Sequence, residues 1–312
     1  MKEYAFGVDI GGTTIKMGLF TTTGDILEKW EIPTRTEENG KYILEDIAKA
    51  VEGKLAEKEI SKLDVEGIGM GVPGPVGDDG TVFKCVNLGW GVFNVEIELK
   101  RLTGLKVKAG NDANVAALGE MWQGGGKGYK NMVMVTLGTG VGGGVIMNEK
   151  IVSGSDGAGG EIGHLHMIDG ETESCGCGNH GCLEQYASAN GIARVTKKYL
   201  AENSDESVLR NEEEITSLAI FNAAKAGDAV ALKMVDYVSD LLGKALSQIA
   251  CVINPQVFVI GGGMSKAGDI LTDAIQKHYK EYAFHACKET YFKVAELSND
   301  AGMVGGVRLI LQ

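Results

Sequence analysis

Residues 4–32 read YAFGVDIGGTTIKMGLFTTTGDILEKWEI. Three apolar segments lie within this stretch, Tyr4–Ile10, Ile15–Phe20 and Ile26–Ile32, and turns rich in Gly and Thr separate them. Short apolar runs bounded by such residues are typical of strands joined by tight turns. The stretch therefore predicts three consecutive strands that begin a sheet.

The same order of elements returns in the second half of the chain. Asn131–Leu137 has the composition of a strand, Gly138–Gly144 of a glycine-rich turn, Val145–Met147 of a return strand and residues 148–150 of the next turn. The chain has 312 residues, which is enough for two domains. The repetition therefore predicts an α/β protein of two related domains that hold a ligand between them.

Apolar periodicity predicts the remaining elements. The expected helices are Lys41–Lys58, Ala113–Trp122, Asp228–Cys251, Lys266–Tyr282 and Gly302–Leu311, and the expected strands are Val65–Val72, Leu105–Ala109, Val257–Ile260 and Tyr291–Ala295. Residues 203–217 are polar and acidic, which indicates an exposed connection.

The charge balance narrows the possible partners. The chain has 42 acidic and 30 basic residues and a net charge of −12, which disfavours nucleic acid and anionic membranes as partners. No apolar run reaches the length of about 18 residues that a membrane span needs. The first residues reach Gly and Asp too early for a secretory signal, and we therefore expect a cytoplasmic protein.

The turn after the first strand has the composition of a phosphate site. Asp9 ends the strand, where its carboxylate can hold a metal ion or its water, and Gly11 and Gly12 let the backbone approach a phosphate. Thr13 and Thr14 then offer hydroxyls to phosphate oxygens. From these residues alone, an ordinary hairpin turn explains the segment equally well.

A second glycine-rich turn, LGTGVGGG at residues 137–144, contains a misleading pattern. Gly138, Gly140 and Gly143 satisfy the G-x-G-x-x-G fingerprint of dinucleotide-binding domains. That fingerprint requires a helix to begin in the glycines and an acidic residue about 20 positions later. Gly144 instead leads into another strand, and the turn does not predict a dehydrogenase.

The third glycine turn, VFVIGGGM at residues 257–264, follows an apolar strand and precedes a helix. Backbone without side chains allows a flat ring such as adenine to lie against it. A loop without a ligand also explains this turn on its own. Three such turns and an Asp at a strand end, in a duplicated chain, favour a nucleotide site.

Asn111 and Asp112 follow a predicted strand and precede a predicted helix. An Asp at such a place, in the connection between two domains, can accept a proton from a substrate hydroxyl. Either residue can instead cap the helix, and the spacing alone favours the cap.

Three of the 6 cysteines cluster in a short glycine-rich segment, at Cys175, Cys177 and Cys182. Thiolates so arranged suit tetrahedral zinc with a histidine as the fourth ligand, and unliganded thiols are the alternative. The spacing leaves three candidate histidines, His164, His166 and His180. The remaining cysteines have apolar neighbours and are expected in the core, namely Cys85, Cys251 and Cys287.

Taken together, these segments resemble the ROK family (repressors, open reading frames, kinases) of the actin-like sugar kinase fold, from one end of the chain to the other. The matching motifs are Asp9–Thr14 and Leu137–Gly144 for phosphate, Ile260–Gly263 for adenosine, and also Gly71–Gly74, Asn87–Trp90, Glu161–His164 and the Cys175/Cys177/Cys182 cluster. The last two are the most specific marks of the family.

The resemblance implies two duplicated actin-like (ribonuclease H-like) domains around a cleft, with residues 1–115 and 301–312 in one and residues 116–300 in the other. It also implies a kinase that transfers a phosphoryl group from ATP to a hexose, with catalytic Mg²⁺ and structural Zn²⁺. Glucose is the expected hexose, because the length and motifs are most similar to those of the glucose-phosphorylating members. Such members form homodimers or homotetramers.

The resemblance further assigns ligands to residues. It implies His164 as the fourth zinc ligand and Asp112 as the catalytic base. The sugar would contact Asn87, Asn111, Asp112, Glu161, His164 and Glu184. ATP and Mg²⁺ would contact Asp9, Gly11, Gly12, Thr13, Thr14, Lys16, Gly138, Thr139, Gly140, Gly261, Gly262 and Gly263.

Several alternatives stay open at this point. The hexose could be fructose, N-acetylmannosamine or allose, and the donor could be polyphosphate. A sugar-responsive repressor is less favoured, because its DNA-binding domain would precede the first strand, where the sequence has only residues 1–3. Such repressors also tend to lose the kinase motifs, which this chain retains.

Overall fold

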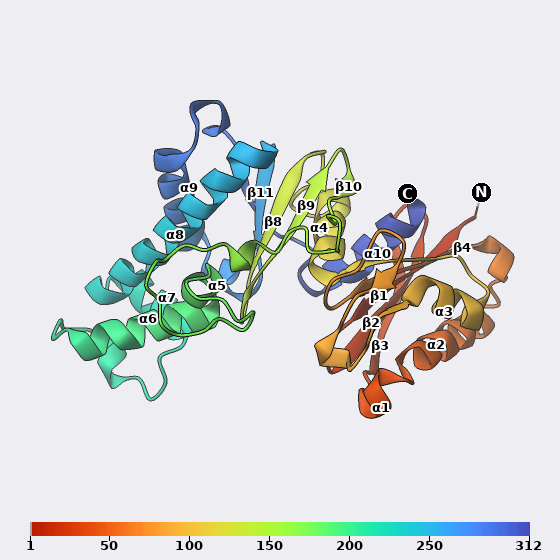
Figure 1. Ribbon diagram of the computed structural model, residues 1–312. Coiled ribbons are helices and arrows are strands. Elements are labelled where there is room, and N and C mark those ends of the chain that lie inside the picture. The colour runs from red at the N-terminus through yellow and green to blue at the C-terminus, as the bar shows by residue number, and fades with distance from the viewer. Residues whose placement is uncertain (1) are drawn as a thin grey trace. The chain divides into compact units, whose positions relative to one another are not determined.

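The computed structural model describes residues 2–312, and these form two compact units (Figure 1). Unit 1 contains the chain up to Lys130 together with Gly144–Gly160 and Glu296–Gln312. Unit 2 contains Asn131–Gly143 and Glu161–Ala295. The expected domains, 1–115 with 301–312 and 116–300, stay a prediction, because compactness alone does not show which segments fold independently.

Unit 1 is built on a five-stranded sheet. Its strands are β1 (Tyr4–Ile10), β2 (Thr14–Thr21), β3 (Ile26–Pro33), β4 (Val65–Val72) and β7 (Val107–Asn111), and a separate hairpin contains β5 (Thr81–Val82) and β6 (Phe93–Asn94). The sheet has the order β3-β2-β1-β4-β7. The first three strands pair antiparallel, and β4 runs parallel to both β1 and β7. The three strands expected from residues 4–32 are thereby confirmed.

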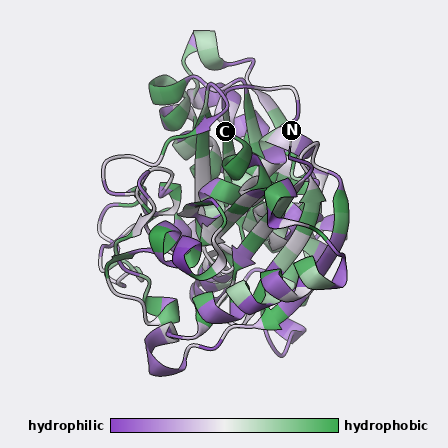
Figure 2. Cartoon of the chain, turned by 90° about the vertical axis from the view of Figure 1, so that its right-hand side faces the viewer, coloured by the Kyte–Doolittle hydropathy of each residue, from purple (hydrophilic) through white to green (hydrophobic). Residues whose placement is uncertain are grey.

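Helices cover both faces of this sheet. They are α1 (Glu37–Gly40), α2 (Ile43–Glu57), α3 (Val95–Thr103), α4 (Asp112–Gln123) and α10 (Ala301–Leu311). On one face, α2 and α3 pack against alternate strand residues such as Phe6 and Val8, and on the other α10 packs against Ala5 and Phe20 (Figure 1). Figure 2 shows strands coloured mainly as hydrophobic and helices that alternate between hydrophobic and hydrophilic segments, as amphipathic elements do.

Glycines allow α10 to approach the sheet closely. A Cβ placed on Gly7 of β1 would lie 2.1 Å from the Met303 carbonyl oxygen, and one on Gly69 of β4 would lie 1.7 Å from that of Gly306. Both distances are far below van der Waals contact. Backbone therefore touches backbone here, and no other residue type fits without displacing the helix.

The second sheet contains β8 (Met132–Leu137), β9 (Val141–Met147), β10 (Lys150–Ile151), β11 (Val257–Gly261) and β12 (Tyr291–Val294). Its order is β10-β9-β8-β11-β12, and β11 runs parallel to β8 and β12. When the strands of each sheet are numbered along the chain, both sheets have the order third, second, first, fourth, fifth.

Strand β9 begins earlier than the sequence indicates. A glycine turn was expected over Gly138–Gly144, but β9 already begins at Val141, and this expectation is wrong. A Cβ on Gly144 would lie 2.5 Å from the side chain of Ala117 on α4. The glycine at this position therefore serves close packing inside a strand and not a turn.

The helices of unit 2 are α5 (Glu184–Ala187), α6 (Ala189–Glu202), α7 (Ser217–Lys225), α8 (Ala229–Ile253) and α9 (Asp269–Tyr282). Cys85 and Cys287 are buried as expected, whereas Cys251 is exposed and the prediction for it is wrong. Cys251 lies on α8 but outside the buried stripe of this helix.

Within residues 2–312, no helix has both the length and the apolar character of a membrane span.

Candidate active site

Two carboxylate residues of unit 1 lie at the same edge of its sheet. Asp9 is near the end of β1 and pairs with Gly71 of β4, and Asp112 follows β7 directly. A Cβ on Gly71 would lie 3.7 Å from Oδ1 of Asp9 and 3.3 Å from Cα of Asp112. Because β1, β4 and β7 run parallel, their carboxyl ends bring these two residues to the two sides of one glycine.

Asp9 lies in a confined environment. A Cβ on Gly302 at the start of α10 would lie 2.5 Å from Cγ of Asp9. Burial raises the pKa of the Asp9 carboxyl above its ordinary value, and the charge of Lys16, its partner on β2, acts in the opposite sense. A cation beside Asp9 would favour the ionised carboxylate.

The turn between β1 and β2 is tight and open to solvent. The N–H of Gly11 donates to the carbonyl of Thr14 over 3.0 Å, and the hydroxyl of Thr34 donates to the carbonyl of Gly11 over 2.7 Å. Gly12 and Thr13 at the tip are exposed, and a Cβ on Gly12 would meet nothing within 4 Å. A ligand therefore has access to the backbone of this turn.

The structure resolves which residue caps α4. Oδ1 of Asn111 accepts the N–H of Asn114 over 3.1 Å, and Nδ2 of Asn111 donates to the carbonyl of Gly74 over 3.1 Å. Asp112 is the first helical residue, and its Oδ1 accepts the N–H of Ala113 over 2.8 Å. The N-cap is therefore Asn111, and Asp112 contacts one further N–H of the first turn.

Asn87 lies on an exposed turn of unit 1. It belongs to the short 3-10 helix Val86–Leu88, between Cys85 and Trp90, which form an isolated bridge. The indole N–H of Trp90 donates to the carbonyl of Gly40 over 3.1 Å and anchors the turn. The Asn87 side chain itself is exposed.

In unit 2, the second and third glycine motifs meet. The N–H of Gly138 donates to the carbonyl of Gly140 over 3.0 Å, which closes a tight turn around the exposed Thr139. Gly262 has φ of 83°, and a Cβ there would lie 2.4 Å from the carbonyl oxygen of Leu137. The segment Ile260–Gly263, predicted to bind adenosine, therefore lies against the strand end from which the predicted phosphate turn begins.

The four residues expected to bind zinc lie together. Their ligand atoms, from His164, Cys175, Cys177 and Cys182, are all within 4.8 Å of one another. The two Sγ atoms of Cys177 and Cys182 are 3.7 Å apart, and Sγ of Cys175 lies 3.7 Å from Nδ1 of His164. Tetrahedral zinc with Zn–S of about 2.3 Å and Zn–N of about 2.0–2.1 Å gives separations of about 3.8 Å and 3.6 Å. The donor set and its spacing fit one tetrahedral zinc ion.

The other two candidate histidines have different partners. The ring nitrogens of His166 lie 2.9 Å from the carbonyl oxygen of His180 and 2.9 Å from Oδ1 of Asp169. Nε2 of His180 lies 3.2 Å from the hydroxyl of Ser174. Among these three histidines, His164 is the one that joins the cysteines.

Burial affects the thiols of this cluster. It raises the pKa of the Cys182 thiol to about 12 and also raises that of Cys175. A hydrogen bond from the Asn179 backbone lowers the pKa of Cys177. A cation is therefore needed to hold all three as thiolates at neutral pH.

Glu184 connects the cluster of His164 and the three cysteines to the second glycine turn. Its Oε2 accepts the N–H of Val141 over 2.9 Å, and its Oε1 lies 3.8 Å from Sγ of Cys175. A Cβ on Gly140 would lie 2.1 Å from Oε2 of Glu184. Oε2 of Glu161, which is exposed, lies 3.8 Å from Nε2 of His164. The predicted sugar residues Glu161 and Glu184 of unit 2 thus lie beside the cluster.

Sequence reasoning missed a buried carboxylate on α4. Glu120 is 0% exposed, and its two oxygens accept the backbone N–H groups of Gly125, Glu296 and Leu297 over 2.8–3.0 Å. These groups lie where the chain is about to leave unit 1 and where it returns. The one sequence signal for Glu120 is that a charged residue occurs within an apolar stretch of the predicted helix.

Known proteins resemble this chain over its full length. The profile described as "ROK family" matches residues 5–312. The glucokinase of Halalkalibacterium halodurans is 45% identical over 98% of this chain and 94% of its own length, and that of Thermotoga maritima is 36% identical over 99% and 98%. A crystal structure of a ROK family glucokinase from Streptomyces griseus in complex with glucose and AMPPNP is 32% identical and covers 98% of both chains with a TM-score of 0.75. With this mixed α/β fold and this similarity over residues 5–312, the chain belongs to the ROK family.

Proposed function

We propose that this protein transfers the γ-phosphoryl group of ATP to glucose and forms glucose 6-phosphate. The observation that carries the proposal is the 45% identity to the H. halodurans glucokinase over 98% of this chain. A similarity of that extent includes both units and therefore every proposed substrate residue. The S. griseus relative was crystallised with glucose and an ATP analogue together, which supports this pair of substrates.

In the proposed reaction, Asp112 is the general base. As the sugar hydroxyl oxygen attacks the γ-phosphorus, its proton passes to the Asp112 carboxylate, and the bond from the γ-phosphorus to the bridging oxygen breaks to release ADP. The assignment of the cap to Asn111 supports this role, because Asn111 and not Asp112 accepts the N–H of Asn114 at the start of α4.

Positioning and charge stabilisation would come from the glycine turns. Phosphoryl transfer has a loose transition state, so an enzyme contributes mainly by holding the phosphates in place. We assign this to the exposed turns with Gly12, Thr13 and Thr139, with Lys16 beside Asp9. Asp9 would hold Mg²⁺ or its water, and Mg²⁺ when bound neutralises charge on the phosphates.

The sugar hydroxyls would be recognised by carboxylate and amide side chains. Glu161 and Glu184 accept hydrogen bonds, and Asn87 and Asn111 can donate and accept. His164 would contribute one ring nitrogen to the sugar and the other to zinc. Zinc would have a structural role, because it would tie together a loop that carries Glu184 at its end.

We also propose that the two halves are duplicated actin-like domains and that the protein forms a homodimer or homotetramer. The identical strand order of the two sheets supports the duplication. Light scattering on the purified protein measures the oligomeric state, and a monomer at micromolar concentration would contradict this part.

The function is tested by identifying the product. The purified protein is incubated with glucose and Mg-ATP, and glucose 6-phosphate is measured with a dehydrogenase that is specific for it. We expect one glucose 6-phosphate for each ADP formed. ADP formed from glucose and ATP without glucose 6-phosphate would contradict the proposal. If no ADP forms with glucose, the same assay with fructose, N-acetylmannosamine or allose tests the other hexoses, and polyphosphate in place of ATP tests the other donor.

A further inference from the structure

Glu171 of unit 2 is a partly buried carboxylate that accepts hydrogen bonds from four donors. Its Oε1 accepts the backbone N–H of Thr172 and of Glu173 over 2.9 Å and 3.1 Å. Its Oε2 accepts the hydroxyl of Tyr186 over 2.5 Å and Nη2 of Arg194 over 3.0 Å. Only 9% of its side chain is exposed, so an uncompensated charge here would be costly.

The electrostatics of Glu171 agree with these contacts. The hydroxyl of Tyr186, the backbone N–H of Glu173 and the Arg194 guanidinium hold the pKa of its carboxyl at about 2. Burial, followed by the neighbouring carboxylate, raises the pKa of Tyr186 to about 12. The carboxylate therefore stays ionised, and the phenol stays protonated, across the physiological range.

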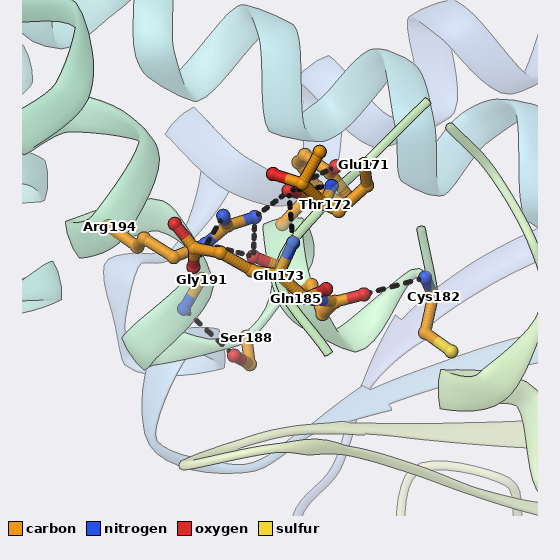
Figure 3. Close-up of polar contacts among 9 residues, drawn as sticks. Glu171, Thr172, Glu173, Cys182, Gln185, Ser188, Gly191 and Arg194 are labelled. Atoms are coloured by element: carbon orange, nitrogen blue, oxygen red, sulfur yellow. Dashed lines mark hydrogen bonds and ion pairs between the residues drawn. The ribbon is translucent and has the colours of Figure 1, made fainter. Parts of the chain in front are cut away.

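Arg194 on α6 extends these contacts to α5. Its Nε and Nη2 donate to the backbone carbonyl of Gln185 over 3.3 Å and 3.1 Å, and its Nη1 lies 3.1 Å from Oε2 of Glu173 (Figure 3). One guanidinium thus joins the segment at residues 171–173 to the carbonyl of Gln185. Its planar group makes this multiple contact possible, which a lysine could not reproduce.

Gln185 carries the connection to the cysteine segment. Its Oε1 accepts the N–H of Cys182 over 3.1 Å, and its Nε2 donates to the carbonyl of Glu173 over 2.9 Å (Figure 3). Glu184 is the adjacent residue in the chain, and its carboxylate accepts the N–H of Val141. The residue that follows Glu184 is therefore held through both its side chain and its backbone carbonyl.

We propose that Glu171, Arg194 and Gln185 form a polar clamp that positions Glu184 and thereby sets the affinity for the sugar. This role rests on the proposed function, in which Glu184 binds a sugar hydroxyl. None of the three clamp residues is assigned a contact with the sugar or with ATP, and all three are positioning residues. Loss of the clamp is therefore expected to weaken sugar binding more than turnover.

The kinetic test uses Glu171→Gln, which keeps the shape but cannot accept from all four donors. We expect the KM for glucose to rise about tenfold, equivalent to about 1.4 kcal/mol and within the range for one disrupted hydrogen-bond set. The kcat should fall less than threefold and the KM for ATP should change less than twofold. Arg194→Lys should raise the glucose KM less than Glu171→Gln.

A matched control removes an ion pair of unit 1 that is remote from the clamp in sequence. Glu28→Gln breaks the bond to Lys54, which is 2.6 Å long, and should leave the glucose KM unchanged. An unchanged glucose KM in folded Glu171→Gln, with only a lower melting temperature, would reduce the clamp to a stability element and overturn the proposal.

A second measurement does not require a correct substrate. Hydrogen exchange is followed in peptides that contain the amides of Val141 and Cys182, the partners of Glu184 and Gln185. In Glu171→Gln both amides should exchange at least several-fold faster than in the wild type, and in Glu28→Gln at the wild-type rate. Unchanged exchange would contradict the clamp even if glucose proved to be the wrong sugar, whereas absent glucose 6-phosphate with faster exchange would contradict only the proposed function.

Discussion

Two regions of the molecule are stabilised by different kinds of contact. One is the contact between the first sheet and α10 in unit 1, and the other is the cysteine segment 161–184 in unit 2. In the first, Gly7 and Gly69 bring backbone against backbone, and apolar side chains fill the rest. In the second, carboxylates, thiols and amides make directional contacts, and only a 3-10 turn at Ile162–His164 and the start of α5 are regular. We conclude that close packing fixes the first region, because other arrangements of the helix would produce clashes. The second region depends on individual hydrogen bonds and on the contacts of its thiols.

The largest expected effect tests whether the packed unit contributes chemistry as well as stability. Asp112→Asn keeps the size of the side chain and leaves the Asn111 cap intact, but it removes the proton acceptor. We expect kcat to fall by about two orders of magnitude or more while the melting temperature changes little.

The comparison variant for this experiment is Asp273→Asn, an exposed carboxylate on α9 that has no proposed role. It should retain wild-type turnover. Near-normal turnover in folded Asp112→Asn would leave Asp112 without a catalytic role.

The second effect tests whether the cysteine segment depends on its metal. Cys177→Ser removes one of four ligands from a loop that has little core of its own, and it should lower both the melting temperature and the affinity for glucose. The wild type should contain one zinc per chain by elemental analysis. Cys251→Ser, which changes an exposed cysteine outside the cluster, should keep zinc, stability and activity. Zinc-free wild-type protein after growth with zinc would remove the metal site.

The third effect tests the glycine packing against α10. Gly69→Ala would place a Cβ 1.7 Å from the Gly306 carbonyl oxygen, and we expect a loss of about 1–3 kcal/mol or more in the free energy of unfolding. Gly53→Ala is the matched control, and it should change the free energy of unfolding in the opposite direction. Gly53 lies inside α2, and a Cβ added there would meet nothing within 4 Å. It should stabilise the protein by about 0.5–1 kcal/mol. Equal effects in urea unfolding would show that close approach does not fix this region.

The smallest expected effect is the pH dependence of the stability that Glu171 provides in unit 2. The folded pKa of Glu171 is about 2 against an ordinary value of 4.5, so the stability it provides is complete above about pH 4.5 and is lost as the pH falls toward about 2. The difference in unfolding free energy between the wild type and Glu171→Gln should therefore be constant from pH 6 to 8 and shrink below pH 4.5. A difference that grows in acid would contradict the assignment.

The sequence was informative where one short pattern carries the structure. Apolar runs with turn residues located β1 and β4 with the correct bounds, Tyr4–Ile10 and Val65–Val72. It failed where glycine serves packing, because the glycines of β9 look like a turn until the Ala117 side chain is seen beside Gly144. The helix Val95–Thr103 was not predicted. Its nine residues alternate between polar and apolar types at the start and are too few to show a clear helical repeat.

The candidate site divides in the same way. Clustered cysteines and an Asp at a strand end are local signals, and the structure brings the cysteines together with His164. The choice of this histidine over His166 and His180 needed coordinates or a family resemblance, because spacing alone allows all three. Glu171 and Arg194 are far apart in sequence, and no spacing rule connects an ion pair of this kind.

The central claim, that this ROK protein is a kinase for glucose, is tested most directly by kcat/KM for a set of hexoses at saturating Mg-ATP. A sugar with one inverted hydroxyl leaves a group that the bound sugar would cover, such as Glu161 or Glu184, without its hydrogen-bond partner, which costs about 1–3 kcal/mol, or roughly ten- to over a hundredfold in specificity. We predict glucose first, mannose and glucosamine much weaker, and N-acetylmannosamine poor. A higher kcat/KM for N-acetylmannosamine or fructose than for glucose would contradict the claim, although a sugar kinase would remain.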